Sequence, residues 1–151
     1  MKRAIVLVSA FAVLIAGVLA GVSLATSGSG TVSTQFGRST FSKFHTRMGS
    51  GDIVVTENSF APGGYSGWHS HPGKVVIAVQ RGEITIYPGS DPKSAGTTYA
   101  SGDVFVERPS DVYNGVNESA TVAAVVNVTY FNVPVGGSVR IDQPKPPNCP
   151  S

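Results

Sequence analysis

Two histidines separated by one residue, His69 and His71, are the residues of this chain whose types and spacing best suit chemistry. They lie in a segment of strand-like composition, and alternate residues of a strand project from the same face. Two neutral imidazoles on one face can supply half of the protein ligands of a transition-metal ion. The same spacing also occurs in surface or hydrogen-bonded histidines that bind no metal, so the pair alone leaves both interpretations open.

The elements that must position these histidines are predicted to be short strands. Several runs rich in β-branched residues have strand length, and no stretch after residue 37 shows the 3.6-residue apolar period of a helix. Gly82 is expected to turn a tight hairpin between residues 75–80 and 83–87. Many short strands separated by turns predict a sandwich or a closed barrel. The runs occupy residues 53–56, 75–79, 84–87 and 122–126.

Length and charge exclude some classes of protein. A chain of 151 residues has room for one domain. Apart from Lys2 and Arg3 it carries nine basic and nine acidic residues. It therefore lacks the excess of basic side chains that a nucleic-acid partner requires.

Residues 1–25 predict a signal peptide or an N-terminal membrane anchor. Lys2 and Arg3 precede an apolar run over residues 4–22 that is interrupted only by Ser9. This run is longer than a usual signal-peptide core and slightly shorter than a usual membrane span, so hydropathy leaves both alternatives open. In either case the rest of the chain is expected outside the cytoplasm, secreted or membrane-anchored, with the membrane as a partner only if the segment is uncleaved.

Composition also marks the flanks of the predicted domain. Residues 26–37 are mostly small and polar, which predicts a flexible spacer. Residues 134–151 contain five prolines and predict an extended tail. The tail carries Cys149, the only cysteine, which is either an inert thiol or one half of an intermolecular disulfide.

Further residues around the histidines fall into a recognisable frame. Gly63, His69, His71 and Gly82 have the separations of one motif, and Gly102 and Asn117 stand at the first and last positions of another. These positions resemble the two motifs of the cupin superfamily. The resemblance implies an all-β fold, the cupin-type double-stranded β-helix or jelly-roll barrel. We expect this barrel over residues 38–133, preceded by the N-terminal hydrophobic helix.

The departures from the motifs concern the metal ligands. Metal-binding cupins typically use three histidines and a glutamate, but here Val75 occupies the glutamate position and Tyr113 that of the third histidine. The resemblance therefore implies a reduced ligand set of His69, His71 and Tyr113 for a weakly held divalent transition metal. Tyr113 is an unusual donor that would have to act as a phenolate.

Three other side chains are expected to line the same pocket. Val75 would make one wall apolar, Asn117 ends the second motif, and Asp111 is a substitute carboxylate two residues before Tyr113 on a regular strand. Glu107 and Lys74 are interpreted as rim or solvent-facing charges without a role.

The sequence supports competing functions. The reduced ligand set favours a pocket for a small molecule or a weakly held metal. The alternative is a metal-dependent cupin enzyme of the dioxygenase, isomerase or epimerase type that uses His69 and His71. A third possibility is a structural domain with a vestigial pocket. One fold serves many functions, so whether the protein is an enzyme stays open at this point.

Overall fold

A computed structural model describes residues 25–41, 50–90, 96–147 and 149. Within these residues the chain is entirely strand, turn and loop, so none of the described segments is a helix that could span a membrane. The all-β prediction is confirmed, whereas residues 1–24, which include almost all of the predicted N-terminal helix, lie outside the described residues. The strands are β1 (Ser29–Phe41), β2 (Gly51–Tyr65), β3 (His69–Ser70), β4 (Val75–Arg81), β5 (Glu83–Pro88), β6 (Thr97–Ala100), β7 (Val104–Glu107), β8 (Tyr113–Val116), β9 (Ala124–Val133) and β10 (Ile141–Asp142).

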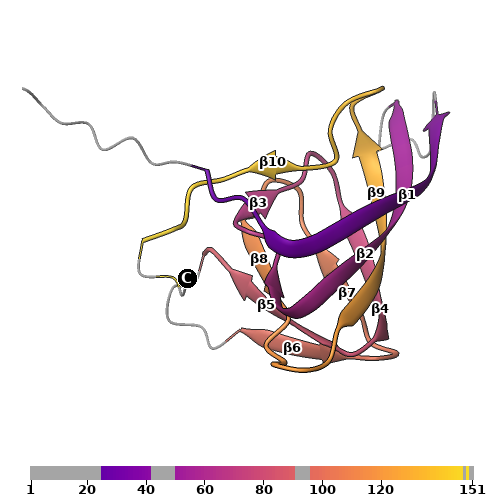
Figure 1. The fold of residues 1–151 in the computed structure, drawn as a ribbon. Helices are drawn as coiled ribbons and strands as arrows, with labels where there is room; N and C mark the ends of the chain where they lie inside the picture. Colours follow the sequence, from indigo (N-terminus) through magenta and orange to yellow (C-terminus); the bar gives the residue numbers. More distant parts are fainter. Residues whose placement is uncertain (1–24, 42–49, 91–95, 148, 150–151) are drawn as a thin grey trace, which may run out of the picture.

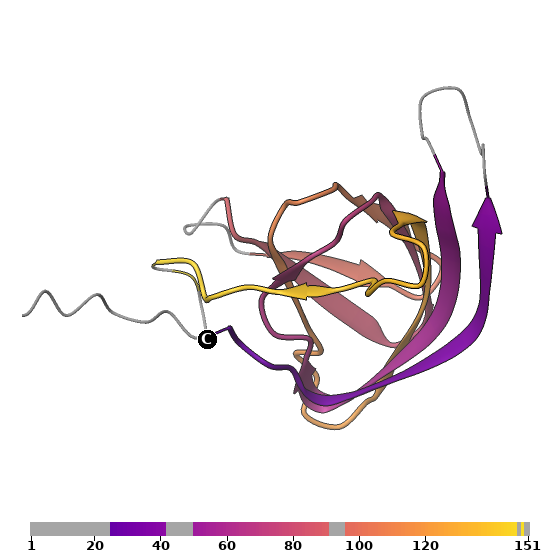
Figure 2. The same ribbon diagram turned by 90° about the horizontal axis from the view of Figure 1, so that it is seen from above.

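These strands form an antiparallel barrel with two faces (Figures 1 and 2). One face has the order β1-β2-β9-β4-β7, and the other contains β6, β5, β8, β3 and β10. The faces join where Tyr65, at the end of β2, pairs with Val116 of β8. Closing the sheet in this way leaves few unpaired edges and encloses an interior.

Gly82 turns a corner between the two faces of the barrel. The predicted hairpin between residues 75–80 and 83–87 is wrong, because β4 pairs with β7 and β9 whereas β5 pairs with β6 and β8. Gly82 has the positive φ of 72° that only glycine adopts readily. A Cβ there would lie 2.6 Å from the carbonyl oxygen of Ala123, so the corner is also too tight for a side chain.

The predicted flexible spacer over residues 26–37 is also wrong, because most of it belongs to β1. This strand pairs along the length of β2, from Ser29 opposite Tyr65 to Phe41 opposite Gly51. Nearly all of its side chains are exposed, which explains why their small, polar types looked like those of a linker. The strand is ordered by backbone hydrogen bonds to the edge of β2, and composition does not reveal such bonds.

The hydrophobic core lies between the two faces. Inward-facing residues alternate along the longer strands, as expected for sheets buried on one side. Ile77 of β4, for example, is 5 % exposed and stands opposite Phe105 of β7 and Val128 of β9. The main members of the core are Val54, Phe60, Val75, Ile77, Val79, Ile84, Ile86, Phe105, Val126, Val128, Tyr130 and Val133.

The segment after β9 crosses one end of the barrel (Figure 2). Its strand β10 pairs with β3, placing Asp142 opposite His69 and Ile141 opposite Ser70. Beyond β10, the amide of Gln143 donates to the carbonyl oxygen of Trp68, and Pro144 bridges to Ala25 near the other end of the chain. We call residues 134–144 the C-terminal strap. Through β10 the strap therefore lies beside β3, the strand that begins with His69.

Asp52 anchors the start of the strap to the barrel. The carboxylate is 1 % exposed and accepts hydrogen bonds from Thr40 Oγ1 at 2.6 Å, the amide of Gly136 at 2.9 Å and Arg38 Nη1 at 2.5 Å. These bonds, led by those from Thr40 and Gly136, lower the pKa of Asp52 to about 2. The carboxylate thus connects β1, β2 and the strap.

We expect Asp52 to make the fold sensitive to acid. Because its pKa is lower in the folded state than the ordinary value of 3.8, the carboxylate stabilises the fold above pH 3.8, and this contribution is lost as the pH falls toward 2. Asp52→Asn should therefore lower the urea midpoint at pH 7 and reduce its further fall between pH 5 and about pH 2. The exposed Asp111→Asn is the control and should behave as the parent. Parallel acid profiles for the parent and Asp52→Asn would contradict the prediction.

Candidate metal centre

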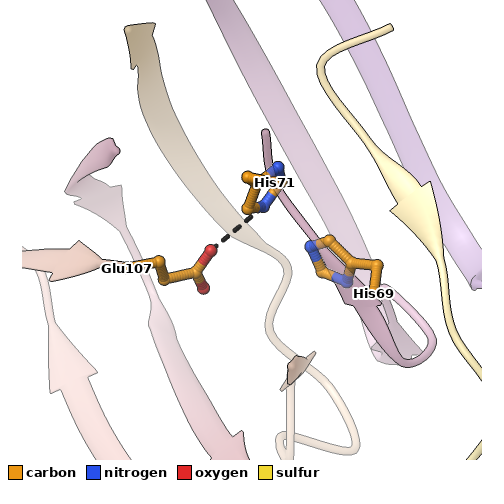
Figure 3. Close-up of side chains that lie close together, drawn as sticks. All are labelled: His69, His71 and Glu107. Atoms are coloured by element: carbon orange, nitrogen blue, oxygen red, sulfur yellow. Dashed lines mark ion pairs between the residues drawn. The ribbon is translucent and has the colours of Figure 1, made fainter. Parts of the chain in front are cut away.

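Three buried side chains converge inside the barrel: His69, His71 and Glu107 (Figure 3). His69 begins β3, His71 follows that strand, and Glu107 ends β7. Their potential ligand atoms all lie within 4.8 Å of one another. The His71 Nε2 atom lies 3.1 Å from Glu107 Oε2, and the two imidazole rings meet edge to face with centroids 4.8 Å apart.

The register between β4 and β7 explains how a glutamate reaches this site. Glu107 is the direct partner of Val75, and direct partners in an antiparallel pair project from the same face. Val75 is buried, so Glu107 also faces inward and is only 6 % exposed. The interpretation of Glu107 as a rim charge is therefore wrong. A carboxylate therefore lies directly beside residue 75, the position of the glutamate in the cupin motif, but it comes from the neighbouring strand.

Backbone carbonyls fix the orientation of both imidazoles. His69 Nδ1 lies 2.8 Å from the carbonyl oxygen of Gly67, and His71 Nδ1 lies 2.6 Å from that of Val139 in the strap. A carbonyl oxygen only accepts hydrogen bonds, so each Nδ1 carries the proton and donates it. In a neutral imidazole this leaves the lone pair on Nε2. Metal-binding histidines are commonly oriented in this way.

His69 is held in its neutral form. Burial is the main cause that lowers its pKa to about 3, and the electrostatic interactions with Arg140 and with the neighbouring His71 act in the same direction. A metal ion that binds His69 near neutral pH therefore displaces no proton from it.

In the described cluster a nitrogen of His71 lies close to a carboxylate oxygen of Glu107. With Nδ1 protonated, the Nε2 lone pair of a neutral His71 faces the carboxylate of Glu107, and two acceptors at 3.1 Å repel each other unless a cation lies between them. The cation can be a proton, which gives a histidinium–glutamate ion pair, or a metal ion.

The donor set fits a transition metal. Bonds of about 2.0–2.2 Å to nitrogen and oxygen permit donors on one ion to be at most about 4.4 Å apart. The donors lie within 4.8 Å, so small side-chain rotations bring all three onto one ion. Two imidazoles with one carboxylate suit ions such as zinc or iron(II) and leave further coordination positions open.

The site opens into a cavity of about 380 Å³ in the barrel. The walls away from the cluster are mostly aliphatic and aromatic and come from both faces. Polar groups are added by Thr31, Ser33, Asn58, Ser66 and Arg140. The apolar lining is formed by Phe60, Ile77, Ile84, Ile86, Phe105, Val126 and Val128.

Tyr113, the predicted third ligand, lies outside the histidine–glutamate cluster. It stands opposite His69 in the β3–β8 pair, but its hydroxyl donates to Asp111 Oδ2 at 3.2 Å and accepts from the amide of Arg108 at 3.4 Å. Burial raises its pKa, which makes the phenolate needed for metal binding harder to form. The structure thus offers Glu107, rather than Tyr113, as the third donor.

The three residues predicted to line the pocket, Val75, Asp111 and Asn117, lie elsewhere in the structure. Asp111 is exposed beside Tyr113, and Val75 is packed into the core. Asn117 is buried, and the two N–H groups of its Nδ2 are shared among the backbone carbonyl oxygens of Phe60, Ala61 and Val122. None of the three lines the cavity.

Comparison with known proteins identifies the fold. No family model matches the sequence, and no curated protein matches it. Among solved structures, the chain is similar to an uncharacterised protein with a double-stranded β-helix domain from Klebsiella pneumoniae (18 % identity, TM-score 0.56, covering 78 % of this chain and 87 % of the other). It is likewise similar to a cupin-like protein from Thermotoga maritima (17 % identity, TM-score 0.56, covering 76 % of this chain and 77 % of the other).

A third similar structure is the polyketide cyclase RemF from Streptomyces resistomycificus (15 % identity, TM-score 0.54, covering 72 % of this chain and 69 % of that one). At these identities the likeness concerns the fold. The chain is a small protein with the cupin fold, as the two sequence motifs predicted. Its described part carries a buried cluster of two histidines and a glutamate inside the barrel.

Proposed function

We propose that the protein binds a divalent transition metal through His69, His71 and Glu107 and holds a small molecule against it in the barrel. The observation that carries the proposal is the convergence of two imidazoles and a carboxylate, all buried, whose potential ligand atoms lie within 4.8 Å of one another. Both imidazoles direct Nε2 toward the site because their Nδ1 atoms are bound to backbone carbonyls. A metal ion would satisfy all three side chains together.

Catalysis is the second candidate function, and the number of ligands favours it. Structural metal sites usually have four protein ligands, whereas three ligands with open positions are typical of catalytic sites. When bound, such an ion would polarise an oxygen atom of the small molecule as a Lewis acid. In either function His69 and His71 would hold the ion in place. The apolar wall that includes Ile84 and Phe105 would exclude water from the cavity.

Metal titration of the full chain tests the proposal. Purified protein stripped with a chelator should bind one zinc or cobalt(II) ion per chain. His71→Ala should weaken this binding by about a hundredfold, because loss of a direct ligand costs at least as much as loss of an outer-shell partner. Tyr113→Phe is the matched control for the ligand predicted from sequence and should bind as the parent does. Calorimetry or a fluorescent competitor measures both.

Two results would contradict the proposed set of metal ligands. A parent protein that binds no ion would leave His71 and Glu107 as a simple ion pair. Equal losses in His71→Ala and Tyr113→Phe would instead return the tyrosine to the ligand set. Circular dichroism of each variant establishes that the fold is intact.

We further infer that the site works outside the cytoplasm. The support for this is the sequence of residues 1–25, with Lys2 and Arg3 before a long apolar run. Protease added to intact cells, after any outer envelope is made permeable, should digest the domain. Complete protection would contradict the inference.

A further inference from the structure

Arg140 of the C-terminal strap brings a fixed positive charge to the cavity. It follows Val139, whose carbonyl oxygen binds His71, and it is one of the residues that line the cavity. Its Nε donates to Asp142 Oδ1 at 2.5 Å. Its side chain is 29 % exposed overall, but its Nη2 atom is buried and has no hydrogen-bond partner among the described residues.

An unpartnered guanidinium nitrogen is unusual. Arginine is always charged, and burying one of its N–H groups without an acceptor costs free energy. Glu107, the one carboxylate among the residues that line the cavity, faces His71 instead. The Nη2 N–H groups have no acceptor among the described residues, and a rotation of the Arg140 side chain, which lines the cavity, would present them to an acceptor there.

The charges around the cavity indicate how much negative charge that acceptor carries. Asp142 offsets Arg140, and Glu107 offsets half the charge of a divalent ion on the cluster. One positive charge is left over, and a single negative charge balances it. No lysine lines the cavity to support a dianion such as phosphate, and the planar guanidinium matches a carboxylate.

The size and lining of the cavity indicate the rest of the molecule. At about 380 Å³ it is at the small end of ligand sites. Ile77, Ile84 and Ile86, together with Phe105, offer no polar groups to a ligand body. A compact branched or aromatic group would fill this space and bury its apolar surface.

We propose that the cavity binds a small apolar monocarboxylate, with its carboxylate held by the Arg140 guanidinium on the side of the histidine–glutamate cluster. This inference rests on the proposed function, because the charge balance includes the metal ion. It adds the chemical class of the ligand and assigns Arg140 as the residue that selects it.

The test compares acids with their neutral amides. Benzoate, phenylacetate and 3-methylbutanoate, each with its amide, are titrated by calorimetry into the zinc-loaded full chain. We expect at least one acid to bind about tenfold or more tightly than its amide. Arg140→Gln should remove that preference, since a charge-assisted hydrogen bond is lost, and should still bind one zinc ion per chain. Arg81→Gln, which removes an exposed arginine of β4, is the matched control and should bind as the parent does.

The outcomes separate this proposal from the metal site. If the parent holds zinc but shows no preference for any acid over its amide, or if Arg140→Gln binds the acid as the parent does, the carboxylate site is overturned and the metal centre stands. If the parent binds no zinc yet prefers the acid through Arg140, the metal centre is overturned and the anion contact survives.

Discussion

Glu107→Val should abolish metal binding, and moving the carboxylate across the strand pair should restore it. The single variant removes the only carboxylate of the described cluster, so we expect a loss of affinity of about a hundredfold or more. Val75 is the direct partner of Glu107 and is buried on the same side of the sheet. In Glu107→Val with Val75→Glu, the carboxylate enters the same interior from β4, and we expect most of the affinity to return.

The exchange distinguishes a ligand from a residue that merely supports the fold. Val75→Glu alone places two carboxylates together and serves as the control for tolerance at residue 75. Zinc titrations and thermal unfolding of all three variants provide the measurements. If the double variant folds but binds no better than Glu107→Val, the register argument for the ligand is wrong.

Ile77→Asp should unfold the domain. Ile77 is at the centre of the β4 contacts with Phe105 and Val128, so the variant loses a buried side chain and introduces a carboxylate with no partner. Losing the side chain alone costs about 2–5 kcal/mol, and the buried carboxylate adds to it. A domain of this size has a stability of about 5–15 kcal/mol, so the variant should be largely unfolded or close to it.

A neighbouring valine provides the control for this variant. Val106 of β7 is 51 % exposed, because it faces outward from the same pair of strands. Val106→Asp introduces the same charge and should cost only about 1 kcal/mol, the usual range of strand preference. Chemical denaturation measures both. Similar losses in the two variants would mean that β4 does not face the core as the structure has it.

The fold was predictable because its signals are local. Runs of β-branched residues indicated four of the ten described strands, and the positions of the two motifs indicated the fold that the strands form. Alternation along a strand also sufficed to expect His69 and His71 on one face. By contrast, β1 has exposed polar side chains and is ordered by its neighbour, so its sequence looked like a linker.

The rest of the site depends on pairings between distant strands. Glu107 enters the cluster only because β7 pairs with β4 in one register, and a shift by one residue would turn it outward. Arg140 reaches the cavity only because the strap crosses the barrel end and pairs with β3. Neither register is marked by local composition. The sequence offered one sign that Glu107 could belong to the site: it is a carboxylate in a strand between Gly102 and Asn117, the ends of the second motif.

The order in which the site can form follows from the position of the strap. The carbonyl oxygen that fixes the His71 ring belongs to a residue 68 positions further along the chain, and β3 takes one of its two strand partners from β10. Such distant contacts form late in folding, because a long loop must close first. During synthesis, which starts at the N-terminus, both histidines are made long before Val139 and Arg140. Completion of the histidine–glutamate cluster and its surroundings therefore waits for the last residues of the domain.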